Sequence, residues 1–128
     1  MIAGHIPAPA PIVWRLITDT QAWPRWGPSV HAVEAPHRFI CPGDEGRVRT
    51  APGLWLPFRV TAQDWEPGRH WRWIVAGVPA TGHRVTPTGP DTCTLEFTIP
   101  AWAPFYRPVC AAAVRRIAAL AASEASPA

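Results

Sequence analysis

Acid–base chemistry in this 128-residue chain would depend on His83 and Tyr106. His83 shares one face of a predicted strand with Val85, and a neutral imidazole that faces inward can act as a general base. A core histidine satisfied by one hydrogen bond is the alternative at this position. Tyr106 is the single tyrosine, and its hydroxyl can donate a proton or hydrogen bond to a ligand carbonyl, or instead reach water at a helix end. We therefore take both as candidate catalytic residues, with the packing alternatives open.

Other catalytic arrangements are not visible in the sequence. Cys110 is predicted one helical turn from Tyr106, where apolar surroundings would raise the pKa of the thiol and leave it inert. Asp19 suits a capping or turn role, and no second carboxylate shares its spacing. The chain has no G-x-S-x-G, phosphate-loop or G-x-G-x-x-G motif. The three cysteines and five histidines are dispersed without zinc spacing, so we expect neither a metal site nor a cofactor.

The N-terminal part of the chain is predicted to hold a short strand followed by two short helices. Residues 2–7 can form the strand, and Pro9 and Pro11 favour the start of a helix. Apolar residues at helical spacing support that helix, and they are Ile12, Val13, Leu16 and Ile17. Trp23–Trp26 is predicted as a further helical turn.

Alternation of apolar and polar residues predicts a sheet in the middle of the chain. Strands are expected over residues 30–34, 47–50, 58–63, 71–75, 82–87 and 93–99. The apolar face of the clearest four carries Phe58, Val60, Trp71, Trp73, Val75, His83, Val85, Cys93, Leu95, Phe97 and Ile99. This alternation is typical of an antiparallel sheet with one face exposed to solvent and the other packed on the core. Leu54-Trp55-Leu56 is expected at or near a loop tip.

A long helix is predicted at the C-terminus, over residues 104–122. Its alanines favour helix, and its apolar stripe consists of Tyr106, Cys110, Ala113, Ile117 and Leu120. Residues 123–128 are expected to be a frayed tail. Together these elements predict one domain over residues 1–122.

Composition narrows the class of protein. Apolar residues make up 48% of the chain and charged residues 16%, which is typical of a globular domain. The twelve basic residues are all arginines, scattered among acidic residues without a basic stripe, so we expect no nucleic-acid partner. No apolar run approaches the ~20 residues that span a bilayer, and no signal peptide is apparent, so a cytoplasmic protein is expected. Eight tryptophans in so small a domain favour a lined cavity.

The order and spacing of several short motifs resemble those of a known superfamily. They run from Ala8-Pro9 and Val13-Trp14 through Asp19, Trp23-x-x-Trp26-x-Pro28, Gly46, Phe58-x-Val60 and Glu66-Pro67-Gly68 to Trp73, His83, Pro87 and Thr92. The chain resembles the START-like helix-grip (SRPBCC) superfamily, in its polyketide cyclase/dehydrase and lipid-transport branch, from about residue 6 to residue 122. The resemblance implies an α+β fold in which a curved antiparallel sheet wraps around a long C-terminal helix. Two short helices between the first and second strands, and a cavity between sheet and long helix, are also implied.

Two functions follow from this resemblance. The chain is expected to bind a small hydrophobic molecule, either as a cofactor-independent polyketide cyclase or dehydratase that uses His83 and Tyr106, or as a non-catalytic carrier or sensor such as a lipid-transport protein. The expected ligand-binding residues are Trp26, Phe58, Val60, Trp71, Trp73, Val85, Phe97 and Cys110. Leu54-Trp55-Leu56 could contact a protein partner or act as a lid on the cavity. The short first strand could leave an open edge that a second copy of the chain covers in a homodimer.

Overall fold

The elements occur in the order that the resemblance implies. The computed structural model describes residues 1–50, 53–64 and 69–125, without the side chains of 62–64. The helices are α1 (Ala10–Thr18), α2 (Trp23–Trp26), the 3₁₀ helix η1 (Pro104–Tyr106) and α3 (Arg107–Ala125). The strands are β1 (Ile2–Ile6), β2 (Ala32–Glu34), β3 (Glu45–Thr50), β4 (Leu54–Asp64), β5 (Arg69–Val75), β6 (Val78–Gly89) and β7 (Thr92–Thr98).

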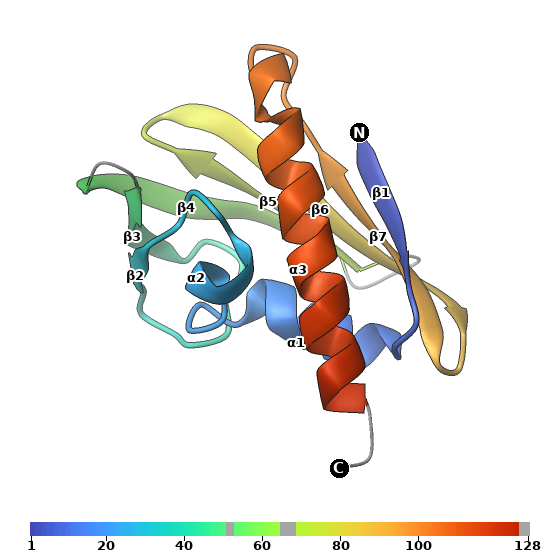
Figure 1. Cartoon of the computed structure of the whole chain (residues 1–128). Coiled ribbons are helices and arrows are strands. Elements are labelled where there is room, and N and C mark those ends of the chain that lie inside the picture. The colour runs from blue at the N-terminus through green and yellow to red at the C-terminus, as the bar shows by residue number, and fades with distance from the viewer. Residues whose placement is uncertain (51–52, 65–68, 126–128) are drawn as a thin grey trace.

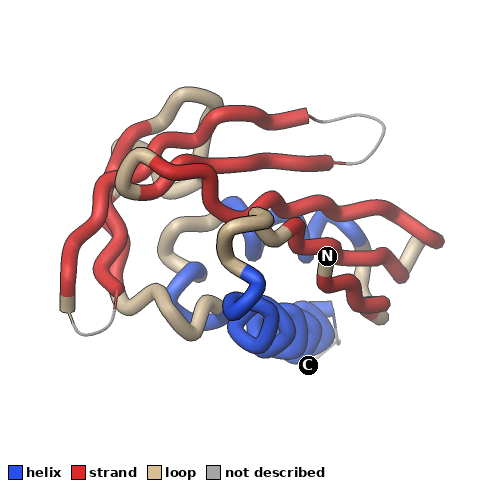
Figure 2. The backbone as a smooth tube through the Cα atoms, turned by 90° about the horizontal axis from the view of Figure 1, so that it is seen from above, coloured by secondary structure: helices blue, strands red, loops and turns tan. Residues whose placement is uncertain are grey.

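One antiparallel sheet covers the helices from a single side. Within the described residues it has seven strands in the order β1-β7-β6-β5-β4-β3-β2. The sheet arches over the helices (Figure 2), and α3 crosses its inner face diagonally (Figure 1). This arrangement confirms the predicted α+β helix-grip fold. Strands β1 and β2 form the two edges, and a homodimer across the β1 edge stays a prediction.

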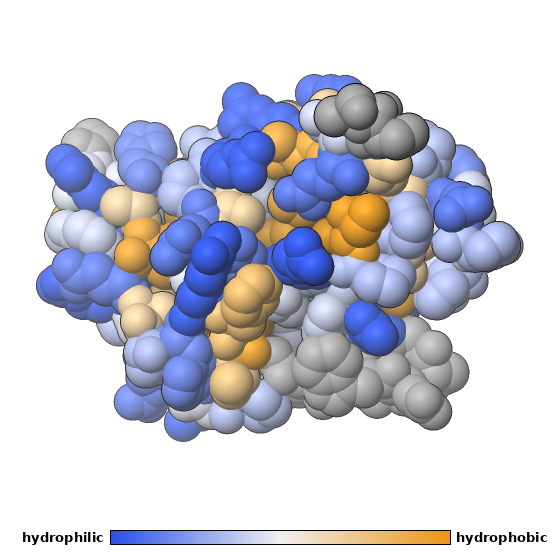
Figure 3. Space-filling view, turned by 90° about the horizontal axis from the view of Figure 1, so that it is seen from below, coloured by the Kyte–Doolittle hydropathy of each residue, from blue (hydrophilic) through white to orange (hydrophobic). Residues whose placement is uncertain are grey.

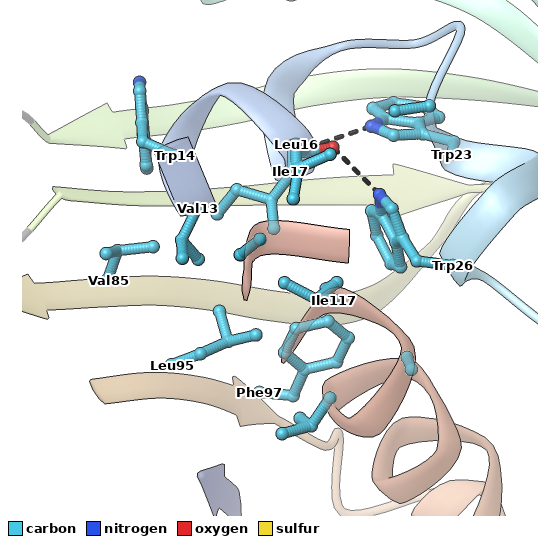
Figure 4. Close-up of a cluster of buried hydrophobic side chains, with 14 of the residues drawn as sticks. Val13, Trp14, Leu16, Ile17, Trp23, Trp26, Val85, Leu95, Phe97 and Ile117 are labelled. Atoms are coloured by element: carbon cyan, nitrogen blue, oxygen red, sulfur yellow. Dashed lines mark hydrogen bonds between the residues drawn. The ribbon is translucent and has the colours of Figure 1, made fainter. Parts of the chain in front are cut away.

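Helix α1 is positioned by its sequence and by the two tryptophans that follow it. Pro9 is its N-cap residue, and Asp19 ends it by donating its backbone N–H to the Arg15 carbonyl. The indole N–H of Trp23 donates to the Ile17 carbonyl at 2.9 Å, and that of Trp26 donates to the Leu16 carbonyl at 2.8 Å (Figure 4). Carbonyls in the last turn of a helix lack helical partners, so these two bonds join α2 to the end of α1.

Helix α3 buries a stripe that differs by part of a turn from the predicted one. Its buried residues are Cys110, Ala113, Val114, Ile117 and Ala121, whereas Tyr106 and Leu120 are half-buried. Val114 is buried because α3 lies close to β1 at Gly4. A Cβ atom at Gly4 would lie 2.5 Å from a methyl carbon of Val114, so the glycine permits this approach.

Several predicted boundaries are wrong. Helix α3 continues to Ala125, three residues into the predicted tail, while residues 126–128 lie outside the described part. Strand β6 begins at Val78 instead of residue 82. Leu54-Trp55-Leu56, expected at or near a loop tip, begins β4 directly after Gly53, and its three residues pair in turn with Thr50, Arg49 and Val48. Pro52 and the turn predicted at residues 66–68 also lie outside the described residues.

The lower face of the molecule carries both hydrophilic and hydrophobic side chains (Figure 3). Among the described helices, none is long and apolar enough to cross a bilayer. Seen from below, hydrophilic side chains alternate with small hydrophobic patches (Figure 3). Scattered apolar surface of this kind is normal for a folded domain.

Candidate functional site

Two cavities of different size lie along the inner face of the sheet, and of these two only the smaller is lined by residues of α3. The larger has a volume of about 340 Å³ and is lined by Ser29, Val30, Val48, Thr50, Leu56, Trp73, Val75, Ala76, Val78, Ala80, Thr81, Pro100, Trp102, Ala103, Phe105 and Tyr106. The smaller has a volume of about 40 Å³ and is lined by Trp23, Trp26, Gly27, Pro28, Ser29, Val30, Trp71, Trp73, Thr81, His83, Phe97, Tyr106, Val109, Cys110 and Ala113. Both are lined by Ser29, Val30, Trp73, Thr81 and Tyr106.

An aromatic stack explains why the larger cavity lies toward one end of the sheet. Trp23 stacks on Trp71 with ring centroids 5.5 Å apart, and Trp71 stacks on His83 at 4.0 Å. Phe97 meets His83 edge-on at 4.8 Å. These rings fill the space beneath the middle of the sheet, so the larger hollow lies beside the β5–β6 hairpin and η1.

The mouth of the larger cavity is apolar. Trp102 and Phe105 line it and are 55% and 70% exposed, and their rings meet edge-on at 6.4 Å. The Trp102 indole N–H donates to the Pro79 carbonyl at 2.9 Å, which links the segment before η1 to the β5–β6 hairpin. Exposed apolar side chains around a cavity are typical of a ligand entrance.

Three of the residues that line both cavities carry hydroxyl groups. Ser29 and Tyr106 form a hydrogen bond between their hydroxyls, and burial raises the pKa of Tyr106. Its phenol therefore stays protonated at neutral pH and can donate to a ligand. The Thr81 hydroxyl accepts a hydrogen bond from the Trp73 indole N–H at 3.2 Å.

His83 is a neutral, fully bonded side chain. Burial lowers its pKa to about 3. Its Nδ1 lies 3.4 Å from the Trp71 carbonyl, and since a carbonyl only accepts, Nδ1 carries the proton. Its Nε2 then accepts from the Thr81 hydroxyl at 3.0 Å. His83 lines only the smaller cavity, so in this geometry it connects to the larger one through Thr81.

The fold brings most of the predicted site residues to the smaller cavity. His83, Tyr106, Trp26, Trp71, Trp73, Phe97 and Cys110 all line it, and Trp73 and Tyr106 line the larger one too. Burial raises the pKa of Cys110 to about 11, so its thiol is protonated and a poor nucleophile.

Three predicted ligand-binding residues lie elsewhere. Phe58, Val60 and Val85 line neither of the two cavities described here. Phe58 packs against Trp23 with centroids 5.6 Å apart, and Val85 lies in the core beside Val13 (Figure 4). A ligand contact at these three positions stays a prediction that the observed geometry does not favour.

Sequence reasoning missed the wall of the larger cavity. Val48 and Leu56 are cross-strand partners on its inner surface, and the alternation of β3 and β4 could have placed them there. Ser29 carried no local signal, because its hydroxyl becomes relevant only through Tyr106, 77 residues away. In the described part of the chain, none of the residues that line the two cavities is Asp, Glu or Arg.

The sequence and the fold are both similar to those of known proteins. Residues 3–124 match the family described as polyketide cyclase/dehydrase and lipid transport. XoxI from Bacillus cereus has a similar fold at 12% identity, with a TM-score of 0.71 and coverage of 98% of this chain and 96% of that one. A point mutant of norcoclaurine synthase from Thalictrum flavum, in complex with a transition-state analogue, has 18% identity, a TM-score of 0.64 and coverage of 98% and 94%.

DynU16, a protein from the dynemicin biosynthetic locus, is similar at 20% identity and a TM-score of 0.62, over 97% of this chain and 47% of that one. No curated protein matches the chain significantly. At these identities the solved structures show a shared fold and not a shared activity.

Proposed function

Because the chain belongs to the polyketide cyclase/dehydrase and lipid transport family, we propose that it binds an uncharged, largely apolar molecule, aromatic or polyketide-like, in the larger cavity. The observation that carries this proposal is a hollow of about 340 Å³ whose lining holds no ionised side chain. Small-molecule sites typically occupy about 300–1,000 Å³ and combine apolar walls with a few polar groups. A charged ligand would lose its hydration here without gaining a counter-charge.

The shared hydroxyls suggest how such a ligand would be oriented. Tyr106, Ser29 and Thr81 lie where the two cavities meet, so the polar end of the ligand would point there and its apolar body toward the mouth. The indole N–H of Trp71, which lines the smaller cavity, is buried without a hydrogen-bond partner in the described structure. A buried donor of this kind gains free energy when an acceptor reaches it.

A matched pair of probes tests this proposal. We expect 2-acetylnaphthalene, a neutral ketone, to bind at least about 10-fold more tightly than the 2-naphthoate anion, because the lining offers the anion no counter-charge. Isothermal titration calorimetry at pH 7.5 measures both dissociation constants. Equal affinities, or tighter binding of the anion, would contradict an uncharged ligand.

A second candidate function is cofactor-independent cyclisation or dehydration of a polyketide. The protonated Tyr106 hydroxyl, held by Ser29, is the observation that favours it. In an aldol cyclisation, an enol carbon bonds to a carbonyl carbon, the enol oxygen loses its proton, and the carbonyl oxygen gains a proton and becomes a hydroxyl. Dehydration then removes this hydroxyl together with a hydrogen of the adjacent carbon as water. Tyr106 would donate to the carbonyl oxygen as charge develops there, while the cavity would orient the flexible chain. His83 would not contact the ligand directly. It would act through the Thr81 hydroxyl, whose hydrogen bond its Nε2 accepts.

Norcoclaurine synthase is an enzyme with this fold, and DynU16 comes from a biosynthetic locus. Both are consistent with a catalytic role, whereas the carrier alternative needs only the cavity.

Replacing Tyr106 with phenylalanine separates these roles. We expect Tyr106→Phe to weaken binding of 2-acetylnaphthalene by roughly threefold to tenfold, the value of one neutral hydrogen bond. Binding of 2-ethylnaphthalene, which lacks the carbonyl, should not change and serves as the control. An equal loss for both probes would mean that Tyr106 only packs. If the chain is a cyclase, turnover of a poly-β-keto substrate should also fall by about 100-fold or more.

A further inference from the structure

A cluster of potential metal ligands lies outside the cavities, in the connection between β2 and β3. This connection runs past the end of α1, where Thr20 donates its backbone N–H to the Arg38 carbonyl at 2.7 Å and Arg38 pairs with Asp19 at 3.0 Å. Further along the connection, Gly43 donates its backbone N–H to the Val60 carbonyl at 2.9 Å. The backbone is therefore held at two points between His37 and Asp44.

The cluster consists of His37, Cys41 and Asp44. One ligand atom from each, an imidazole nitrogen, the thiol sulfur and a carboxylate oxygen, lies within 4.8 Å of the other two. His37 Nδ1 is 3.0 Å from Asp44 Oδ2. Asp44 is buried, and its Oδ2 also accepts the backbone N–H of Cys41 at 2.9 Å. Cys41 and His37 are exposed, so an ion could enter from solvent.

We propose that His37, Cys41 and Asp44 form a Zn²⁺ site. With metal–ligand bonds of about 2.0–2.3 Å at tetrahedral angles, the ligand atoms would be about 3.3–3.6 Å apart. The observed separation of nitrogen and oxygen is already close to this value. The sulfur needs to approach by at most about 1.2–1.5 Å. Rotation of the exposed Cys41 side chain supplies this movement and replaces its weak 3.8 Å contact with the Phe39 carbonyl.

The chemistry of the three ligands favours Zn²⁺ over harder cations. A thiolate and an imidazole are ligands for zinc, whereas Ca²⁺ and Mg²⁺ prefer oxygen. Binding releases the Cys41 thiol proton to solvent, and the resulting thiolate together with the Asp44 carboxylate balances the two charges of the ion. Three protein ligands leave the fourth position to water. The spacing of these residues in sequence does not match common zinc motifs, and only the folded connection brings them together.

Titration of the full chain with Zn²⁺ and Co²⁺ tests the proposal. We expect one Zn²⁺ per chain in competition with a chromophoric chelator, and a higher midpoint of thermal unfolding when Zn²⁺ is present. The Co²⁺ form should show a near-ultraviolet band from sulfur-to-cobalt charge transfer. Bound Zn²⁺ should also slow alkylation of Cys41 by iodoacetamide by at least about 10-fold, because the metal-bound thiolate is shielded.

Single substitutions assign the ligands. Cys41→Ser should abolish the charge-transfer band although Cys93 and Cys110, which are buried, remain. His37→Ala should weaken Zn²⁺ binding by at least about 10-fold, whereas His31→Ala, an exposed histidine outside the cluster, should not. Circular dichroism of each variant checks that it is folded. Absence of Zn²⁺ binding at 100-fold excess over protein, or a band that survives Cys41→Ser, would overturn the site.

Discussion

Acidification from pH 6.5 to pH 4.5 is expected to lower the free energy of unfolding by about 2 kcal/mol more in the native chain than in a His83→Gln variant. Burial lowers the pKa of His83 to about 3 in the folded chain, compared with about 6.5 in an unfolded one. The unfolded state therefore takes up the proton first. The stabilisation is complete above the unfolded pKa and is lost as the pH falls toward the folded pKa.

Urea unfolding at several pH values between 7.5 and 4.5 measures this difference. The substitution itself costs stability, because it disturbs the bond to Thr81 and the stacking on Trp71, but that cost is constant with pH. The informative quantity is the slope of the unfolding free energy against pH. The control variant His31→Gln, at an exposed position, should retain the slope of the native chain. Parallel curves for the native chain and His83→Gln would show that the imidazole is not held neutral.

Filling the larger cavity should eliminate ligand binding with little effect on the fold. Val75 lies at the end of β5, on the inner face, and lines this cavity. An indole at this position would occupy the space that we assign to the apolar body of the ligand. We expect Val75→Trp to weaken binding of 2-acetylnaphthalene by at least about 30-fold, which corresponds to roughly 2 kcal/mol.

The neighbouring residue supplies the matched control. Ile74 lies on the same strand but pairs with Arg59 and lines neither of the cavities in the described structure. Ile74→Trp should therefore bind the probe as the native chain does. Calorimetry is the suitable measurement, since both variants add a fluorophore. If Val75→Trp binds normally, the ligand occupies another part of the molecule.

Local sequence patterns were sufficient to predict many of the strands and helices of the fold. The alternation of Cys93, Leu95 and Phe97 with polar residues predicted a strand with one buried face, and all three are buried in β7. Pro9 and the apolar spacing after it predicted α1. Periods of 2 and 3.6 residues arise from backbone geometry within a single element, so they can be read before any tertiary contact is known.

Other boundaries depended on pairing between elements. Strand β6 begins four residues earlier than predicted because Val78 and Pro79 pair with Val75 and Ile74 across a short hairpin. Its turn contains Ala76, whose φ of 52° is unusual for a residue other than glycine. Neither alternation nor composition indicated this hairpin, which forms part of the cavity wall.

The sequence by itself determined many of the residues that face inward, including His83, Tyr106 and the tryptophans of β5. Only the tertiary structure decided which of those residues pack and which line a hollow. That outcome depends on what each side chain meets across the domain: Trp71 is covered by Trp23, whereas Val75 borders the larger cavity. The same reason applies to Ser29 and Tyr106, because a hydrogen bond between distant segments exists only after the chain has folded.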